Sequence, residues 1–400
     1  MMRKELRIAV IGGGIGGLTA ALCLRRAGFE VEVYEQAPAL THIGGGINMG
    51  PNAARILIRL GLGDGLLRDG VRPLSSHQRR WEDGRTLQRA PLNPRCEQLY
   101  GAPHITIHRA DLLAVISSAF PAERIHLGHR LTGLADKSDY VEAWFDNGVR
   151  IAPDILVGAD GIHSAVAGAL FGGEAPQFAG CVAYRGLVPV ERVTDLGLEL
   201  GSQSWVGPGA HLVHYFVSRG RLLNFVGWTE HDEWNREDWT DRATVVSALA
   251  VFEGWHPQVR RIIGAADECF IWALFDRDPL PRWSVGRITL LGDACHPMYP
   301  FMGQGAAQSI EDGAALAACL ALGADDPPAA LRHYQELRLP RVTRLQQLSR
   351  ANKLRFHMRD GPEQKARDAE WAQAGDRGPE ALRWLYEHDP ATVQSAEISV

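Results

Sequence analysis

The stretch that decides the fold runs from residue 8 to residue 36 and reads IAVIGGGIGGLTAALCLRRAGFEVEVYEQ. Residues 8–11 form a short apolar run typical of a strand, and Gly12, Gly14 and Gly17 follow it in G-x-G-x-x-G spacing. Residues 18–27 have helical character, and a second strand-like run ends at Glu35. Strand, turn, helix, strand and acid in this order predict a βαβ unit that binds a dinucleotide.

Each part of this unit has a physical task. Gly12 allows a tight turn, Gly14 lets the backbone approach a pyrophosphate, and Gly17 lets helix and strand pack closely. The free N–H groups at the start of the helix face the phosphates. Glu35 can accept hydrogen bonds from ribose hydroxyls, which fits the unphosphorylated ribose of FAD or NAD.

An export signal is the alternative interpretation of the N-terminus. Met1–Lys4 precede an uncharged run as in a signal peptide, and Cys23 could be a lipidation site. Five glycines interrupt the run, however, and Arg25-Arg26 leads into a strand and not into a cleavage site. We therefore expect this segment to belong to the fold.

The composition is that of a globular protein with a large core. The chain has 400 residues, 46% hydrophobic and 22% charged, which favours two domains. The net charge of -5 gives no electrostatic case for nucleic acid or for an anionic membrane. Six cysteines without a C-x-x-C pair argue against a metal site or a disulfide scaffold and for a reducing, cytoplasmic location. We expect a monomer or a homodimer.

Several features follow the opening unit. A glycine run at 44–46 would let the backbone lie against a flat ligand, with an ordinary loop before a helix at 52–60 as the equal alternative. A hairpin is predicted at 78–87. Arg109 stands just before a helix, where it suits either a phosphate or flavin edge or a surface salt bridge. Asp160 ends a buried strand at the edge where parallel sheets bind ligands, with helix capping as the alternative.

The sequence pattern changes in the middle of the chain. From about residue 177 to residue 275 the strands are short, aromatic and alternating, which predicts a separate, mainly antiparallel sheet covering the dinucleotide domain. Residues 288–291 return as a buried strand, and long helices are predicted at 307–322 and 329–358, the second kinked at Pro340.

Three separated segments together indicate a family. The βαβ unit, VGADGIHS at 157–164 and LGDACHP at 291–297 closely resemble the three signature motifs of the single-component, FAD-dependent aromatic hydroxylases. The resemblance covers about residues 6–350 and includes the segment around Arg109 and the loop at 300–306. Within the family the chain is similar to salicylate, 3-hydroxybenzoate and 6-hydroxynicotinate hydroxylases.

The resemblance implies an α/β fold like that of p-hydroxybenzoate hydroxylase. A Rossmann-type FAD-binding domain would take residues 1–176 and 278–358, with helices in the second part. A mainly antiparallel β-sheet substrate domain would be inserted at 177–277. A helical C-terminal tail would follow at 359–400.

The resemblance also implies which residues bind the cofactor. The ADP half of FAD is assigned to Gly12, Gly14, Gly16, Gly17, Glu35 and Gln36. Further cofactor residues are Gly45, Asn48, Arg109, Leu131, Asp160, Asp293, Gly305 and Ala306. Among these, Asp293 would bind the ribityl-pyrophosphate region, and the N–H groups at 305–306 would lie near the flavin pyrimidine, where reduced flavin is negative. Asp160 matches a residue linked to both FAD and the nicotinamide cofactor.

The family chemistry uses NADH or NADPH as a transient reductant. Reduced FAD reacts with O2, and the resulting flavin hydroperoxide hydroxylates an electron-rich ring. A second G-x-G-x-x-G unit for a resident nicotinamide cofactor is absent from the sequence. The protein must add substrate activation, because a phenol becomes a better nucleophile as its phenolate.

His211 and Tyr215 are the residues predicted to act on the substrate. In a strand they share one face about 13 Å apart, which suits groups that read opposite ends of a small aromatic acid. An imidazole with an ordinary pKa of about 6.5 can accept a phenolic proton. Histidine acts as the base at this spacing in 3-hydroxybenzoate and 6-hydroxynicotinate hydroxylases; a structural His and Tyr is the alternative. His214 has the wrong face, and His163 and His296 lie within FAD motifs.

The substrate itself is less specified. The 6-hydroxynicotinate enzymes carry histidine where Asn48 and Phe301 stand, and the 3-hydroxybenzoate enzymes carry glutamine where Pro300 stands. We therefore predict a monooxygenase of a small phenolic aromatic acid and favour a salicylate-type reaction with loss of CO2. The alternatives are a flavoprotein epoxidase or reductase of the same fold on a non-phenolic substrate, and a flavin-binding protein without activity.

Overall fold

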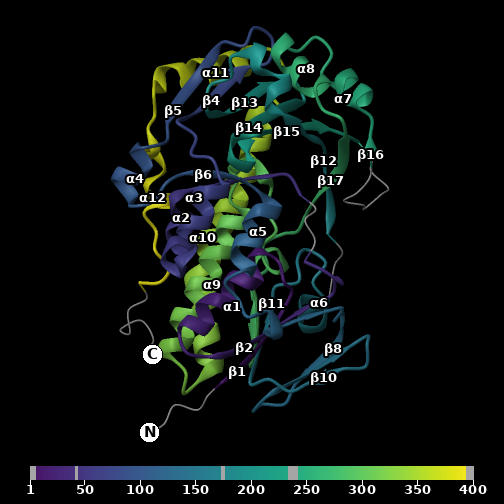
Figure 1. Cartoon of the computed structure of the whole chain (residues 1–400), viewed down its shortest axis with the longest axis vertical. Helices are drawn as coiled ribbons and strands as arrows, with labels where there is room; N and C mark the ends of the chain where they lie inside the picture. Colours follow the sequence, from purple (N-terminus) through teal and green to yellow (C-terminus); the bar gives the residue numbers. More distant parts are fainter. Residues whose placement is uncertain (1–5, 41–43, 173–175, 233–241, 393–400) are drawn as a thin grey trace.

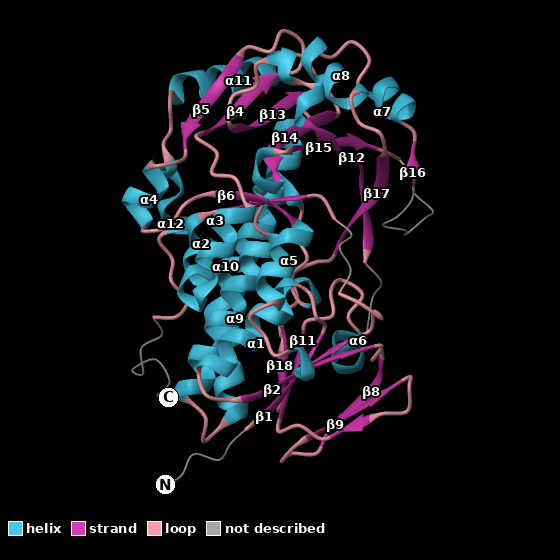
Figure 2. Cartoon of the chain, viewed as in Figure 1, coloured by secondary structure: helices cyan, strands magenta, loops and turns pink. Residues whose placement is uncertain are grey.

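The computed structural model describes residues 6–40, 44–172, 176–232 and 242–392. In Figure 1 the molecule is elongated, with both chain ends in its lower part. The lower part holds a parallel sheet and long helices, and the upper part is a large twisted sheet topped by α7, α8 and α11 (Figures 1 and 2). This agrees with the predicted α/β fold with an added antiparallel sheet.

The lower sheet is built on the opening βαβ unit. β1 (Arg7–Ile11), α1 (Ile15–Arg26) and β2 (Glu30–Glu35) form as predicted, and β1 pairs in parallel with both β2 and β11 (Ile155–Gly158). The strand order is β18-β19-β11-β1-β2-β7. The other members are β7 (Ile125–Leu127), β19 (Ile288–Leu290) and the edge strand β18 (Ser284–Val285), which alone among these described strands runs antiparallel to its neighbour. Because both faces of the sheet are covered, its central strands are continuous apolar runs.

The upper sheet contains the strands predicted between 177 and 277. Its order is β16-β17-β12-β15-β14-β13-β4-β5. The middle strands are β12 (Gln177–Pro189), β13 (Gly201–Gly207), β14 (Ala210–Val217), β15 (Leu222–Glu230) and β17 (Cys269–Asp276), and β16 (Arg242–Ala243) is an edge strand. One face of the sheet packs on α7 (Val245–Val251) and α8 (Pro257–Gly264). The other face turns toward the parallel sheet.

The sheet departs from the predicted division into domains at one place. β4 (Ser75–Arg80) and β5 (Thr86–Pro91) form the predicted hairpin, but β4 runs parallel to β13 and so extends the upper sheet. Residues 75–91 had been grouped with the FAD-binding part, 1–176. The hairpin is visible in local sequence, whereas its pairing with a strand about 125 residues away is not.

A second departure concerns the glycine run. Residues 46–49 form a strand, β3 (Gly46–Met49), that pairs with β6 (Ile105–His108), so the loop alternative is wrong there. The predicted helix begins as α2 (Pro51–Leu57) and passes through a π-helical turn at 58–62 into α3 (Gly63–Asp69). The remaining elements before β12 are α4 (Arg95–Tyr100), α5 (Arg109–Ser117), β8 (Leu131–Asp136), β9 (Val141–Phe145), β10 (Arg150–Ile151) and α6 (Ala165–Phe171).

Two long helices run along the molecule beside the parallel sheet (Figure 1). α9 (Gly305–Leu322) packs on α1 through small residues, since a Cβ on Gly313 would lie 2.8 Å from Cα of Ala20. α10 (Pro327–Phe356) continues as one helix through Pro340. Both predicted helices are therefore present.

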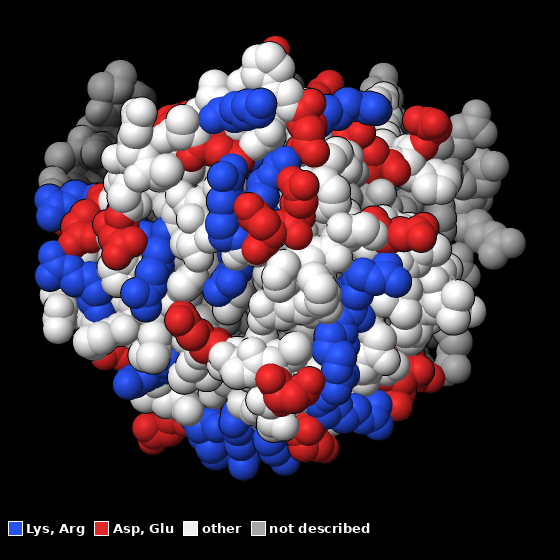
Figure 3. Space-filling view, turned by 90° about the horizontal axis from the view of Figure 1, so that it is seen from above, with Lys and Arg blue, Asp and Glu red and all other residues white. Residues whose placement is uncertain are grey.

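The C-terminal tail is helical in part. α11 (Pro362–Ala374) and α12 (Arg383–Tyr386) lie within it, and residues 393–400 of the predicted tail fall outside the described residues. Among the described residues, none of the helices is long and apolar enough to cross a membrane. On the face shown in Figure 3, basic and acidic side chains are interspersed.

Candidate active site

A cavity of about 210 Å³ lies between the upper sheet and the loops that follow β11 and β19. It is lined by Ile162, His163, Trp228, Trp272, Ala273, Leu274, Phe275, Asp293, Pro297, Met298 and Pro300. The lining thus joins two signature motifs to strands β15 and β17. A larger, open depression of about 840 Å³ beside α8 contains none of the predicted site residues. Trp228 and Trp272 line the smaller cavity, whereas Trp205 lies in the hydrophobic core that the upper sheet forms with α7 and α8.

The glycines of the first motif have different tasks. Gly12 has a φ of +109°, and a Cβ there would lie 2.3 Å from the carbonyl oxygen of Ala159. A Cβ on Gly17 would lie 2.0 Å from the carbonyl oxygen of Gly12, so both glycines serve close backbone packing. Gly14 faces open space, and no side chain caps the N-terminus of α1 after it. This uncapped helix start is suited to a pyrophosphate.

Gly16 has a packing role that the sequence did not reveal. A Cβ at this position would lie 2.8 Å from Cβ of Ser309 on α9 and 2.9 Å from the Leu291 side chain. The glycine therefore lets α9 approach α1. This contact fixes the position of the first motif relative to the helix that begins at Gly305.

The carboxylate of Glu35 is fixed in place at the end of β2. It accepts hydrogen bonds from the N–H groups of Gly13 (2.7 Å) and Ala37 (2.9 Å). Each oxygen keeps a further lone pair that a ribose hydroxyl can use. Gln36 is exposed beside it, and Leu131 is buried at the start of β8.

Arg109 is half-buried at the start of α5. Its N–H donates to the carbonyl oxygen of Gly45 at 3.0 Å, and Gly44 lies over its side chain. Burial lowers the pKa of Arg109, while the charges of Asp293 and Glu35 act in the opposite direction. The guanidinium thus lies within the field of two carboxylates, Glu35, predicted to bind a ribose, and Asp293, predicted to bind the ribityl-pyrophosphate region.

The two acids of the later motifs differ in how their carboxylates are used. Asp160 accepts hydrogen bonds from the hydroxyl of Ser164 (2.5 Å) and the N–H of Val166 (3.2 Å), so it caps the start of α6. This is the alternative role that the sequence allowed. Asp293 borders the cavity, and burial raises the pKa of its carboxyl. A group with these properties can accept a hydrogen bond from a bound ligand.

The N-terminus of α9 has no side-chain cap. Gly305 and Ala306 begin the helix after Gln304, and a Cβ on Gly305 would meet open space. Free N–H groups and the helix dipole make this turn suitable for a group that becomes negative. The uncapped starts of α1 and α9, together with Arg109, are the features that fit an FAD molecule.

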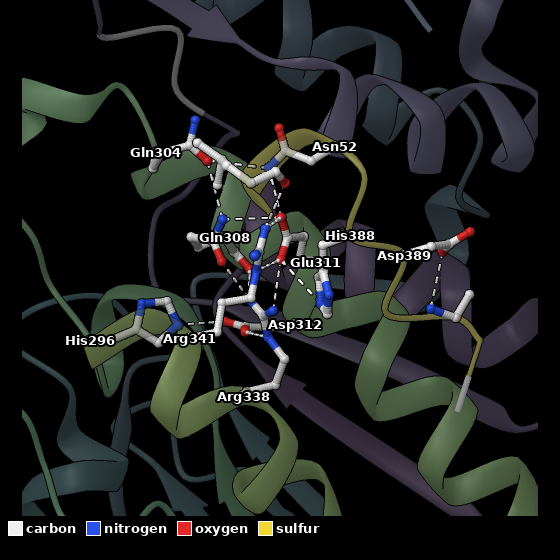
Figure 4. A network of polar contacts seen from close by, with 12 residues as sticks. Asn52, His296, Gln304, Gln308, Glu311, Asp312, Arg338, Arg341, His388 and Asp389 are labelled. Carbon is white, nitrogen blue, oxygen red and sulfur yellow. Dashed lines mark hydrogen bonds and ion pairs between the residues drawn. The ribbon is translucent and has the colours of Figure 1, made fainter. Parts of the chain in front are cut away.

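A buried polar network holds this turn from behind (Figure 4). Glu311 accepts hydrogen bonds from Asn52 (2.6 Å), Arg338 (2.7 Å) and Arg341 (2.8 and 2.9 Å). The Gln304 side chain accepts from Asn52 (3.2 Å) and from Gln308 (3.1 Å). The network therefore fixes Gln304, the residue that precedes the turn at Gly305 and Ala306.

The same network reaches the third motif. Asp312 accepts hydrogen bonds from Arg338 (2.7 Å) and from the N–H of Gly292 (3.0 Å), and it lies 2.6 Å from the Nε2 of His296. Burial acts to raise the pKa of both Glu311 and Asp312. The charge of Arg338, and for Asp312 also that of His296, outweighs burial and lowers each pKa to about 2. His296 is thus a structural residue of its motif.

The glycine strand lies against the upper sheet. The N–H of Gly46 donates to Oδ1 of Asn224 at 2.8 Å, and a Cβ on Gly46 would lie 2.4 Å from the Tyr215 ring. Only glycine leaves room for that ring. The Asn48 side chain is hydrogen-bonded to His104, so its predicted contact with the cofactor would have to come from the opposite side of the amide or from the backbone.

His211 and Tyr215 are both buried on β14. His211 packs edge-on against Phe301, with ring centroids 4.9 Å apart, and Phe301 packs in the same way on the cavity residue Trp228. Burial, with a contribution from His357, lowers the pKa of His211 well below its ordinary value. His214 is buried too, and burial together with Arg79 lowers its pKa to about 3.

Arg185 on β12 is a site residue that the sequence analysis missed. Its guanidinium lies 3.1 Å from the centroid of the cavity residue Trp272, and its Nη1 is 3.4 Å from the Cβ position of Gly45. Among the described residues no carboxylate pairs with it, and its buried Nη1 has no hydrogen-bond partner. Burial and the charge of Arg109 lower its pKa to about 9. An arginine inside an apolar, aromatic strand was the available signal.

Comparison with known proteins identifies the family of the chain. Residues 5–349 match the FAD-binding-domain family model. The 3-amino-4-hydroxybenzoate 2-monooxygenase PtmB3 of Streptomyces platensis is 42% identical over 97% of this chain and 98% of its own length. The 6-hydroxynicotinate 3-monooxygenase of Bordetella bronchiseptica is 39% identical over 88% of this chain and 92% of its own.

Solved structures show the same fold. HpxO of Klebsiella pneumoniae, complexed with FAD and uric acid, has a TM-score of 0.84 at 28% identity, covering 99% of this chain and 97% of its own. A salicylate hydroxylase substrate complex has a TM-score of 0.83 at 27% identity, covering 99% and 98%. The chain therefore belongs to the FAD-dependent aromatic hydroxylases and is a flavoprotein monooxygenase of that family.

Proposed function

We propose that this monooxygenase hydroxylates a small phenolic aromatic acid. The observation that carries the proposal is the buried cation of Arg185, which lies next to the Trp272 wall of the cavity and has no carboxylate partner in the described part of the chain. A buried charge without a partner is costly, so a site that keeps one is suited to a ligand of opposite charge. The carboxylate of an aromatic acid provides that charge and a planar acceptor for the guanidinium.

In this proposal Tyr215 and His211 contact the substrate at groups other than its carboxylate. Tyr215 lies between Arg185 and the glycine strand, where its hydroxyl can orient the acid. His211 accepts the phenolic proton. Removal of that proton enriches the ring in electrons, and the apolar rings around His211 exclude water from the exchange.

FAD, reduced by NADH or NADPH, supplies the activated oxygen. Gly14 and the start of α1 would bind the pyrophosphate, Glu35 the ribose, and Arg109 and Asp293 the region between pyrophosphate and flavin. The N–H groups of Gly305 and Ala306 would stabilise the negative charge of reduced flavin. The other predicted cofactor residues stay predictions: Gly45, Asn48, Leu131 and Gln36 as direct contacts, and Asp160 through the turn that it fixes.

A hydroxybenzoate is the substrate class that we favour, because a relative matching nearly the whole chain is named for 3-amino-4-hydroxybenzoate. Loss of CO2 requires attack on the carbon that carries the carboxylate. The likeness to a salicylate hydroxylase supports it as the second candidate outcome.

The test is NADH and NADPH oxidation with a panel containing 3-amino-4-hydroxybenzoate, 3-hydroxybenzoate, salicylate and 6-hydroxynicotinate, followed by mass analysis of each product. The proposal expects stimulated oxidation by at least one acid and a product with one added oxygen; a product that has also lost CO2 would establish the second outcome. His211→Ala should lower coupled turnover about 100-fold or more at neutral pH. Wild-type turnover in that variant would remove His211 as the base. No stimulation by any phenolic acid would overturn the substrate class.

A further inference from the structure

His211 has a buried partner on a distant part of the chain. Its Nδ1 lies 2.7 Å from Nε2 of His357, which ends α10, and the two ring centroids are 5.0 Å apart. Both imidazoles are almost fully buried. In a hydrogen bond between two neutral imidazoles one ring donates and the other accepts, so each ring fixes the tautomer of the other.

His357 in turn leads to the surface. Its Nδ1 is 3.5 Å from Oε1 of Glu230, and the Glu230 side chain is 47% exposed. The backbone holds this arrangement, because the N–H of Gly209 donates to the carbonyl oxygen of His357 (3.0 Å) and the N–H of Glu230 donates to that of Gly209 (2.9 Å). His211, His357 and Glu230 thus form a row from the buried site to solvent.

We propose that His357 and Glu230 are the proton-exit path of His211. The proposal rests on the proposed function, in which His211 takes the phenolic proton. The substrate O–H bond breaks as an N–H bond forms at Nε2 of His211. The proton on Nδ1 of His211 passes to Nε2 of His357, and the proton on Nδ1 of His357 passes to Glu230 or to water beside it. One proton enters at the substrate and one leaves to solvent, with no oxidant or reductant involved.

The surroundings of His211 explain why such a path is needed. Phe301 and Phe356 pack against its ring, and the nearest titratable partner is His357. An imidazolium in this environment is strongly disfavoured, which makes an isolated His211 a poor base. If the proton moves on as it arrives, no cation has to persist in the apolar cluster.

The charges around His357 define the direction of transfer. Lys353, one turn earlier on α10, donates to the carbonyl oxygen of Ala179 (2.7 Å) and disfavours a positive charge on His357. Burial and this charge lower the pKa of His357 to about 3. Among the described residues, Glu230 is the carboxylate within ion-pair distance of this imidazole. A proton on His357 is therefore passed on toward Glu230 and solvent.

The central experiment is His357→Gln in the FAD-loaded enzyme. Glutamine keeps a hydrogen-bonding group beside His211 but cannot relay a proton. With 3-amino-4-hydroxybenzoate as probe, stopped-flow absorbance should show phenolate formation slowed about tenfold or more, with the dissociation constant changed less than twofold. In His357→Ala, added imidazole should restore at least part of the rate. A merely structural histidine would tolerate glutamine and would not respond to imidazole.

Glu230→Gln provides a second variant at a half-exposed position, where folding is not at risk. It should slow phenolate formation severalfold and raise the solvent deuterium isotope effect on this step. Glu199→Gln is the matched control, because Glu199 is also half-exposed and lies 3.3 Å from the buried His77 away from the site; its rate should equal that of the wild type.

The outcomes separate the path from the base. Slow phenolate formation in His211→Ala together with wild-type rates in His357→Gln and Glu230→Gln would overturn the exit path and leave the proposed function intact. A wild-type rate in His211→Ala would instead contradict the proposed base. Slowing in Glu199→Gln equal to that in Glu230→Gln would also overturn the path, since it would trace the effect to surface charge.

Discussion

The two sides of the site treat buried charge in opposite ways. Behind the turn at Gly305, Arg338 and Arg341 are neutralised by Glu311 and Asp312. On the upper sheet, Arg185 is equally buried but has no carboxylate partner among the described residues. Paired buried charges stabilise a fixed structure, whereas an unpaired buried charge leaves an interaction for a ligand. The first region therefore supports the fold, and the second is the region that we propose to recognise the substrate.

The largest effect should come from breaking the network of paired charges. Arg338→Met leaves two buried carboxylates without their shared cation and should lower the free energy of unfolding by about 3–5 kcal/mol. Urea unfolding followed by fluorescence measures it. Arg332→Met, at an exposed position on the same helix, should change the value by less than about 0.5 kcal/mol. A loss below about 1 kcal/mol in Arg338→Met would show that the network is not the support we describe.

Removal of the Arg185 cation should weaken substrate binding without lowering the stability of the fold. Arg185→Met should leave the unfolding free energy unchanged or higher, because it removes an uncompensated buried charge. It should weaken binding of the substrate acid by about 2–5 kcal/mol, or roughly 30-fold or more. The control is the matching aromatic amide, which should bind wild type and variant equally. A destabilised variant with normal affinity for the acid would reverse the comparison.

The smallest effect is a difference in pH dependence between the two regions. Burial lowers the pKa of His214 on the upper sheet to about 3, and that of His104 to about 4. Between about pH 6.5 and these values only the unfolded chain binds the proton, so stability falls as the pH falls. Glu311 and Asp312 have folded pKa values of about 2, so their contribution is present above about pH 4.5 and is lost as the pH falls toward 2.

Urea unfolding at a series of pH values separates the two windows. Between about pH 6.5 and 4.5 the slope should be smaller in His214→Gln than in wild type, by up to about 1.4 kcal/mol per pH unit. Below this range the slope should be reduced in a variant that lacks the carboxylates. An unchanged slope in His214→Gln would mean that this histidine is protonated in the folded protein.

Local pattern was sufficient for much of this structure. The G-x-G-x-x-G unit and the alternating strands are defined by short-range periodicity, and they were predicted nearly to their ends. The same holds for Glu35 at the end of β2 and for α9, which was predicted to begin at residue 307 and begins at Gly305. Each depends on neighbours within a few residues in sequence.

What escaped prediction depends on distant pairing. The addition of β4 to β13, the pairing of β3 with β6 and the contact of His211 with His357, 146 residues apart, leave no local trace. Arg185 is visible in the sequence as an arginine within an apolar strand, but only the three-dimensional arrangement shows that it has no carboxylate partner among the described residues. The capping role of Asp160 could be listed as an alternative but not chosen from sequence.

The order of strands in the parallel sheet has a consequence for biosynthesis. β1 is synthesised long before β19, which starts at residue 288 and belongs to the same sheet. The proposed cofactor site also includes the N-terminus of α9 at residue 305. A ribosome-bound chain of 280 residues therefore lacks β19 and the start of α9, and with them part of the proposed cofactor site. Flavin binding by the proposed site therefore requires synthesis past residue 305 and cannot begin when the βαβ unit alone has been made.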